Sequence, residues 1–206
     1  NFVDVSNEAY IRLVSSKDYA AGLSAELKFF SSSARQVKDF SSPQAFSDVQ
    51  GFYLTGAAYY KLDTRNKRYF NTEGSKIEAY TRLMYPISGQ GFEGARQKLG
   101  YNFDFEFQHA LPLAKRWTVG LAANLGISRG EKTQPYLYIL GGNNQNFINN
   151  FKSFIGLPFA KTAATDIAMG SSYFQFSPFK DQYLTLSGHA AVIENAFELP
   201  GKKQSS

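Results

Sequence analysis

The sequence predicts an all-β fold, and three observations support this prediction. Apolar and polar side chains alternate with a period of two along many segments, as in a strand with one apolar face. Several of these segments span about 10–13 residues, whereas strands of soluble sheets usually have about 5–6 and a tilted membrane-spanning strand needs about 9–11. The connections between the segments alternate between short and long. Together these features favour an antiparallel transmembrane β-barrel with about eight strands.

The alternation is clearest in Leu99–Ala110, where it is almost complete: every second residue from Leu99 to Phe107 is apolar, and those from Gly100 to Gln108 between them are polar or glycine. The odd-numbered positions of 19–30, 77–85 and 117–127 form similar apolar rows. The pattern is weakest in the seventh segment, because it changes phase within 170–176. In chain order, the expected strands are Glu8–Val14, Tyr19–Phe30, Gly51–Leu62, Ser75–Tyr85, Lys98–His109, Arg116–Ser128, Ala163–Phe176 and Gln182–Ile193.

The connections are sorted by length. Residues 15–18, 111–115 and 177–181 form short links and residues 63–74 an intermediate one. Long links lie between them, at 31–50, 86–97 and 129–162. Outer-membrane barrels have short turns at their periplasmic end and longer loops at their external end, so this sorting favours a barrel of that kind.

The two faces of the strands predict an inside and an outside. The polar rows are also rich in Gly, Ala and Ser, which suits a crowded interior. We therefore expect the polar rows to face a lumen and the apolar rows to face lipid. The expected lumen-facing charges are Glu26, Lys28, Glu78, Arg82, Asp104 and Glu106. The expected lipid-facing residues of the clearest strand are Phe103, Phe105 and Phe107.

Composition excludes several other classes. The net charge is +5, but Lys and Arg are spread along the chain without a basic block, so we expect no nucleic-acid partner. The chain has no Cys, which excludes disulfides and thiolate metal sites. His109 and His189 lack a second ligand at metal spacing, so we expect no metal or cofactor. No apolar run approaches the roughly 18 residues of a membrane helix.

The stretch "LDTRNKRYFNTEGSKIEAYTRLMYP" resembles the turn-plus-strand signature of the BamA/TamA-like superfamily of outer-membrane assembly and secretion barrels, the bacterial surface antigen type. Asn71 stands where that signature usually has Pro. The residues that fit the signature are Asp63, Arg65, Arg68, Tyr69, Phe70, Thr72, Glu73, Gly74 and Ser75.

A second resemblance lies in Pro135–Phe159. In the superfamily, a Gly-Gly pair precedes a long loop that folds into the lumen, and an (I/V)-R-G-(F/Y) motif in this loop places an Arg against acidic residues of the inner wall. Gly141 and Gly142 match the pair. The motif position is occupied by Ile148, Asn149, Asn150 and Phe151, so the arginine ion pair is not implied for this chain.

The stretch "DIAMGSSYFQFSPFKDQYLTLSGHAAVIEN" is similar to the hairpin after this loop in the patatin-like branch of Bacteroidetes type. The resemblance, over residues 50–195, implies a barrel that anchors a protein in the bacterial outer membrane and translocates or inserts polypeptide. It also implies an upstream patatin-like lipid acyl hydrolase. Because the superfamily barrel has sixteen strands, we expect residues 1–206 to be one partial or trimmed barrel domain. The expected partners are outer-membrane lipid and either other envelope proteins or a second copy of the chain.

Two alternatives remain open. "GISRG" at 126–130 fits the nucleophile-elbow pattern, so a self-contained outer-membrane lipid-modifying enzyme would use Ser128 with His109. The polar stretch after Gly130 does not have the pattern of a helix, and we therefore expect no catalytic residue in this chain. The second alternative is a soluble lipocalin-like binding barrel, in which Phe103, Phe105 and Phe107 would be buried in protein.

Overall fold

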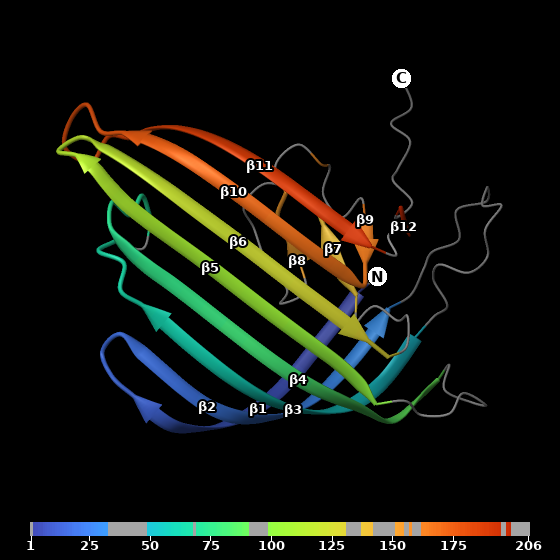
Figure 1. Ribbon diagram of the computed structural model, residues 1–206. Coiled ribbons are helices and arrows are strands. Elements are labelled where there is room, and N and C mark those ends of the chain that lie inside the picture. The colour runs from blue at the N-terminus through green and yellow to red at the C-terminus, as the bar shows by residue number, and fades with distance from the viewer. Residues whose placement is uncertain are drawn as a thin grey trace.

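The computed structural model describes residues 2–32, 49–67, 69–90, 99–130, 137–141, 151–154, 157, 162–194 and 197–198. Eight strands form one antiparallel sheet in the order β1-β2-β3-β4-β5-β6-β10-β11 (Figure 1). Their bounds are β1 Phe2–Ser15, β2 Tyr19–Ser32, β3 Val49–Asp63, β4 Gly74–Gln90, β5 Gly100–Ala114, β6 Trp117–Arg129, β10 Asp166–Phe176 and β11 Leu184–Glu194. The all-β, antiparallel prediction is confirmed. No helix in these parts of the chain is long and apolar enough to cross a membrane.

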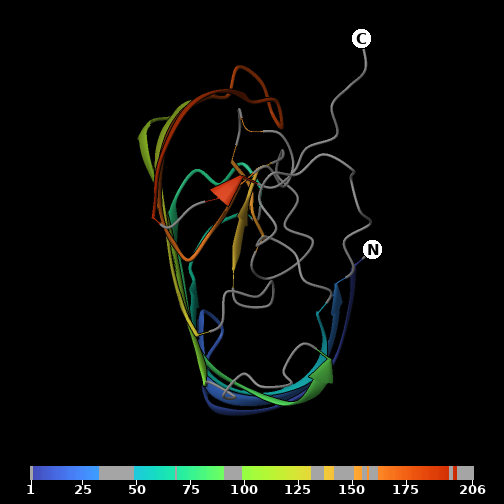
Figure 2. The same ribbon diagram turned by 90° about the vertical axis from the view of Figure 1, so that its right-hand side faces the viewer.

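The sheet curves into a deep trough (Figure 2). We call its inner side the concave face and its outer side the convex face. β1 and β11 form the two edges, and the described strands do not close into a ring. The connections β1–β2, β3–β4, β5–β6 and β10–β11 all lie at one end, which we call the short-turn end (Figure 1). The strand ends that the longer connections join lie at the opposite end, as the alternation of short and long connections in the sequence predicts.

The strands are long because neighbouring strands keep pairing beyond the apolar rows. They range from 11 residues in β10 and β11 to 17 in β4. β1 begins at Phe2 rather than at the predicted Glu8, because its backbone pairs with β2 as far as Ser32. Small register shifts occur in three places, and one of them lies beside Pro112, which has no N–H to donate.

The predicted single strand Ala163–Phe176 is wrong in one respect. It divides at Thr165 into β9 (Thr162–Ala164) and β10, because the Thr165 carbonyl accepts a hydrogen bond from the Ser128 N–H at 2.8 Å. The change of phase within 170–176 is a change of the apolar pattern and not of the backbone, since β10 pairs with β6 without a register shift. Ile167 and Met169 pack in a buried cluster on the concave side, whereas Phe174 lies on the convex side and is 41% exposed.

A second, smaller sheet lies inside the trough (Figure 2). Its order is β12-β9-β7-β8, with β7 Tyr138–Leu140, β8 Phe151–Lys152 and β12 Phe197–Glu198. Tyr138, Leu140 and Ala164 of this sheet pack with Ile167 of β10 and are fully or nearly fully buried. The apolar core of the described chain therefore lies between the small sheet and the concave face.

Candidate functional site

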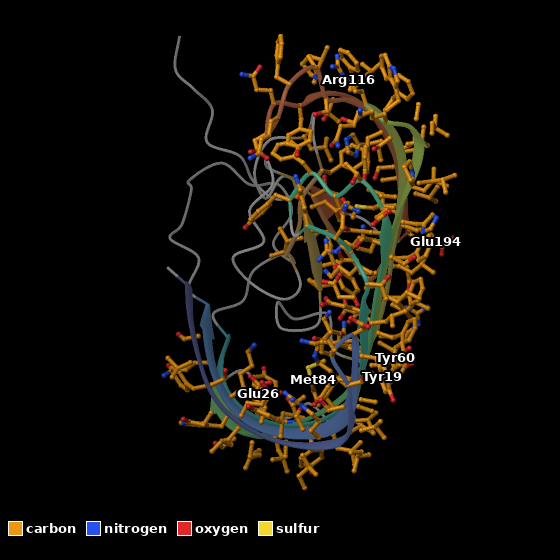
Figure 3. The ribbon with its side chains drawn as sticks, turned by 90° about the vertical axis from the view of Figure 1, so that its left-hand side faces the viewer. Tyr19, Glu26, Tyr60, Met84, Arg116 and Glu194 are labelled. Atoms are coloured by element: carbon orange, nitrogen blue, oxygen red, sulfur yellow. The ribbon has the colours of Figure 1, made fainter. Side chains whose placement is uncertain are left out.

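The concave face carries a polar cavity of about 560 Å³. The period-two alternation places polar side chains of β1 to β5 in its wall. Figure 3 shows Glu26 and Met84 on this inner side of the trough. Five of the six predicted lumen charges line the cavity, namely Glu26, Glu78, Arg82, Asp104 and Glu106. Lys28, the sixth, is half-buried on the same side of β2 as Glu26 and has an interaction partner of its own.

The charges on β4 and β5 are paired with one another. Arg82 Nη1 lies 2.6 Å from Asp104 Oδ2, and it also donates to Asn102 Oδ1 at 2.9 Å. The Lys76 ammonium lies between two carboxylates, 2.9 Å from Glu106 and 3.3 Å from Glu78. Opposite charges facing each other across strands satisfy groups that would otherwise be costly to bury. The wall at β4 and β5 is therefore a fixed polar surface.

The β1–β2 side of the cavity differs from the β4–β5 wall. Glu8 and Glu26 are directly opposite one another in the antiparallel pair, where like charges are unfavourable. Tyr59 and Tyr80 lie between the two sides, with the Lys61 ammonium 6.0 and 5.4 Å from their ring centroids. The cavity thus combines mixed charge with aromatic rings, which is a surface that water and polar chains can wet.

Part of the chain folds inward onto the β4–β5 wall. We call residues 137–141 together with 151–152 the inward segment. Tyr138 is fully buried, and its hydroxyl accepts a hydrogen bond from Asn102 at 2.6 Å and donates to the Phe103 carbonyl at 2.9 Å. Burial raises the pKa of the Tyr138 hydroxyl, which stays protonated as a donor. Lys152 Nζ lies 3.1 Å from Asp104 Oδ1.

Asp104 is therefore shared by two cations, Arg82 of the wall and Lys152 of the inward segment. Its side chain is only 8% exposed, so little water screens these pairs. Sequence reasoning missed Lys152, because the superfamily motif has its arginine at the position of Asn149. The only feature of the sequence that could have indicated this role is that a Lys follows the motif directly. Ile148, Asn149 and Asn150 lie outside the described residues, and of Phe151 only the backbone, in β8, is described.

Tyrosine rings of the concave face lie over glycines. A Cβ on Gly22 would come within 2.7 Å of the Tyr59 hydroxyl oxygen, and one on Gly126 within 2.6 Å of the Tyr138 ring. A Cβ on Gly120 would overlap the Tyr173 ring. The glycines of the polar rows therefore provide room for aromatic side chains, whereas an added Cβ on Gly170 of β10 meets open space.

The convex face carries the apolar rows. Phe103, Phe105 and Phe107 are half-buried and alternate along β5 with Asp104 and Glu106, which line the cavity, and Phe105 also contributes to the cavity wall. Many other large apolar side chains on this face are exposed, including Leu23 at 49%, Leu54 at 51% and Leu121 at 52%. Trp117 stacks on Phe174 and Phe176, with centroid distances of 4.8 and 4.2 Å, close to the short-turn end. Contact of these residues with lipid stays a prediction.

The structure does not assemble the residues of the alternative enzyme. Ser128 is 2% exposed and pairs with Asn102, near the start of β5. His109 pairs with Ser75 and Leu121 at the other end of β5, and its Nδ1 lies 2.8 Å from Ser75 Oγ. Ser128 and His109 thus lie at opposite ends of the sheet. In the described part of the chain, no group of three His, Cys, Asp or Glu residues could hold a metal ion.

The signature turn, described for residues 64–67 and 69–73, is held by polar contacts at its base. Arg65 Nε and Nη2 donate to the two oxygens of Asp63 at 2.8 and 2.7 Å, and Nη1 donates to Gln108 Oε1 of β5 at 3.1 Å. Gly74 ends the turn with a φ of +97°, which favours glycine. Arg68, which fits the signature in sequence, lies outside the described residues.

Comparison with known proteins agrees with this architecture. A model of the OMP85 superfamily matches residues 1–202, which is nearly the whole chain. None of the curated proteins that were compared matches it. Membership of this superfamily points to the bacterial outer membrane, and its members are in general transport or insertion proteins rather than enzymes. The resemblance to BamA/TamA-like barrels is thus confirmed at the level of the superfamily. The chain belongs to the OMP85 superfamily of outer-membrane β-barrel proteins.

Proposed function

We propose that residues 1–206 form part of the wall of one outer-membrane barrel domain that translocates or inserts polypeptide. The observation that carries this proposal is the two-faced sheet, with a polar, aromatic cavity on the concave face and exposed apolar rows on the convex face. An extended polypeptide has unpaired backbone groups along its length. Such a chain needs a wet, polar path through the membrane, because unsatisfied backbone groups are costly in hydrocarbon.

The proposal includes the partners and the attached domain. Outer-membrane lipid would contact the convex face, with Phe103, Phe105 and Phe107 among the contacting residues. Other envelope proteins or a second copy of the chain are further candidate partners. The resemblance to the patatin-like branch supports an upstream patatin-like hydrolase in the same polypeptide, with this chain as its anchor. The coding sequence upstream of residue 1 tests the last point, and a gene without a patatin-like domain would contradict it.

Reconstitution tests the activity. The full-length product of the gene is placed in vesicles of bacterial polar lipid, and an unfolded eight-stranded outer-membrane protein is added as probe. We expect the probe to gain the heat-modifiable gel mobility of an inserted barrel faster than in empty vesicles. A variant with Glu78→Ala and Tyr80→Ala, both in the cavity wall, should lose most of this gain. In a parallel assay, a soluble unfolded polypeptide should become protected from external protease. Failure of both assays would contradict the proposed function.

A further inference from the structure

The signature turn reaches across the concave face to strands far away in the sheet. It connects β3 to β4, yet its outermost residues contact β10 and the β10–β11 turn. Lys67 Nζ donates to the Tyr183 hydroxyl at 2.8 Å, and the Phe70 ring stacks on the Tyr183 ring with centroids 4.8 Å apart and planes at 5°. Strands are about 4.8 Å apart, and β5 and β6 lie between β4 and β10. The turn therefore bridges the short-turn end of the trough.

A third contact lies deeper on the concave face. The Tyr173 hydroxyl of β10 donates to Asn71 Oδ1 at 3.2 Å. Gly74, Ala110, Gly120 and Tyr173 form one row across β4, β5, β6 and β10. Because Ala110 and Gly120 are small, the Tyr173 ring lies along this row toward the turn. Asn71 stands where the superfamily signature usually has Pro, and its amide oxygen makes this contact possible.

Burial of the wall beneath the turn supports the same arrangement. Ala110 is 1% exposed, Thr118 is 4% and Gln175 is 2%. Inner-face residues of β2 far from the turn, such as Ser24 and Glu26, are only half-buried. The turn thus covers the inner face of β5, β6 and β10 at this end.

The base and the tip of the turn are held differently. At the base, the Thr64 N–H donates to the Ser75 carbonyl at 2.8 Å, and the Ser75 N–H donates to Thr64 Oγ1 at 2.9 Å. At the tip, Phe70 is 54% exposed and has a φ of +51°, which is unusual for a residue with a bulky side chain. The tip is therefore fastened by solvent-exposed contacts, which are weaker than the paired strands at the base.

We propose that residues 64–67 and 69–73 form a strap that closes the short-turn end of the concave face and opens when its tip leaves Tyr183. A role of the strap in regulating polypeptide passage rests on the proposed function, because a polypeptide that passes along the concave face would have to displace the strap. Its position and its release are properties of the chain alone.

Cysteine labelling tests the strap directly. Residues 1–206 contain no Cys, so once any Cys encoded elsewhere in the gene is replaced by Ser, Thr118→Cys in the full-length protein places a single thiol beneath the strap. The probe is a charged, membrane-impermeant maleimide, and no client polypeptide is present. We expect slow labelling of Thr118→Cys and fast labelling of Ala57→Cys in the open cavity wall. Adding Tyr183→Ala should accelerate labelling of Thr118→Cys about tenfold, since a hydrogen bond and a ring contact are lost together.

Phe179→Ala is the matched control. Phe179 belongs to the same turn as Tyr183 and is 70% exposed, but the contacts described above do not involve it. Phe179→Ala should leave the labelling rate of Thr118→Cys unchanged. Equal labelling of Thr118→Cys and Ala57→Cys, or no acceleration by Tyr183→Ala in a protein with unchanged heat-modifiable mobility, would overturn the proposal. If Tyr183→Ala does not fold, Lys67→Met gives the same test with a smaller expected acceleration. Failure of the insertion assays alone would leave the strap unaffected.

Discussion

The ammonium of Lys152 lies 3.1 Å from a carboxylate oxygen of Asp104, and this ion pair joins the inward segment to the wall of the sheet. The other oxygen of Asp104 lies 2.6 Å from Arg82 of β4. The carboxylate is buried and the two cations are mostly buried, so the consequences of removing them are unequal.

Asp104→Asn should destabilise the protein more than Lys152→Met. Asp104→Asn leaves Arg82 and Lys152 without a counter-charge, and breaking a buried pair in this way costs about 3–5 kcal/mol. Lys152→Met leaves Asp104 paired with Arg82 and removes one ion pair, so we expect a smaller loss, within the range of about 0.5–3 kcal/mol that is usual for single substitutions. Urea unfolding in lipid vesicles measures both. Arg12→Gln, on the exposed edge strand, serves as control and should change stability little; equal losses for the two test variants would argue against the shared carboxylate.

Gly120→Ala should destabilise the sheet because its Cβ would overlap the Tyr173 ring. Overpacking of this kind costs about 1–3 kcal/mol. Gly170→Ala, on the neighbouring strand, meets open space and should stay within about 0.5 kcal/mol of the wild type. Unfolding free energies from urea titration compare the two.

A second substitution checks the cause of the Gly120→Ala effect. If the Tyr173 ring is the obstacle, Tyr173→Ala should cost less in the Gly120→Ala background than in the wild type. An additive double variant would show that the alanine acts elsewhere.

Much of the fold could be predicted from the sequence, because alternation is a local property that each long strand displays by itself. The short strands of the inward segment display no such pattern. Tyr138–Leu140 is too short to alternate, and Lys152 gains its role only through Asp104, which lies 48 residues earlier in the sequence. Likewise, Asn71 and Tyr173 are 102 residues apart, and nothing local links them. Contacts that form only when the chain folds back across the sheet could therefore not be predicted from the sequence.

The division of the seventh predicted strand has a similar cause. Residues 162–164 are apolar or small and extend the pattern of β10, so the sequence alone does not indicate that they join another sheet. The break at Thr165 depends on the hydrogen bond to Ser128 of β6. The glycines of the polar rows predict a crowded interior, and the tyrosine rings that lie over them give this prediction its physical basis.

The assignment of the convex face to lipid can be tested with a charge. Phe107→Arg should cost about 2–4 kcal/mol in vesicles, the penalty for Arg near the membrane midplane on a barrel surface. Ser24→Arg is the matched control, because Ser24 lines the polar cavity and lies opposite Tyr10 and Ala57, so that an added charge meets water and no cation across the strands. Unfolding free energy in vesicles is the measurement. A similar small cost for both variants would show that the convex face meets water rather than lipid, and it would contradict the assignment.

Arg65→Lys should show that the signature turn needs a guanidinium rather than a positive charge. Arg65 donates to both oxygens of Asp63 and, through its third nitrogen, to Gln108 of β5. A lysine ammonium cannot span these three acceptors, because it lacks the planar fork of arginine. We expect a loss of about 1–2 kcal/mol in unfolding free energy, corresponding to about one or two hydrogen bonds. Arg12→Lys should be neutral, because the hydrogen bond of Arg12 to Ser15 is long, at 3.4 Å, and exposed. If Arg65→Lys is also neutral, the turn depends on charge alone and the fork geometry at its base is dispensable.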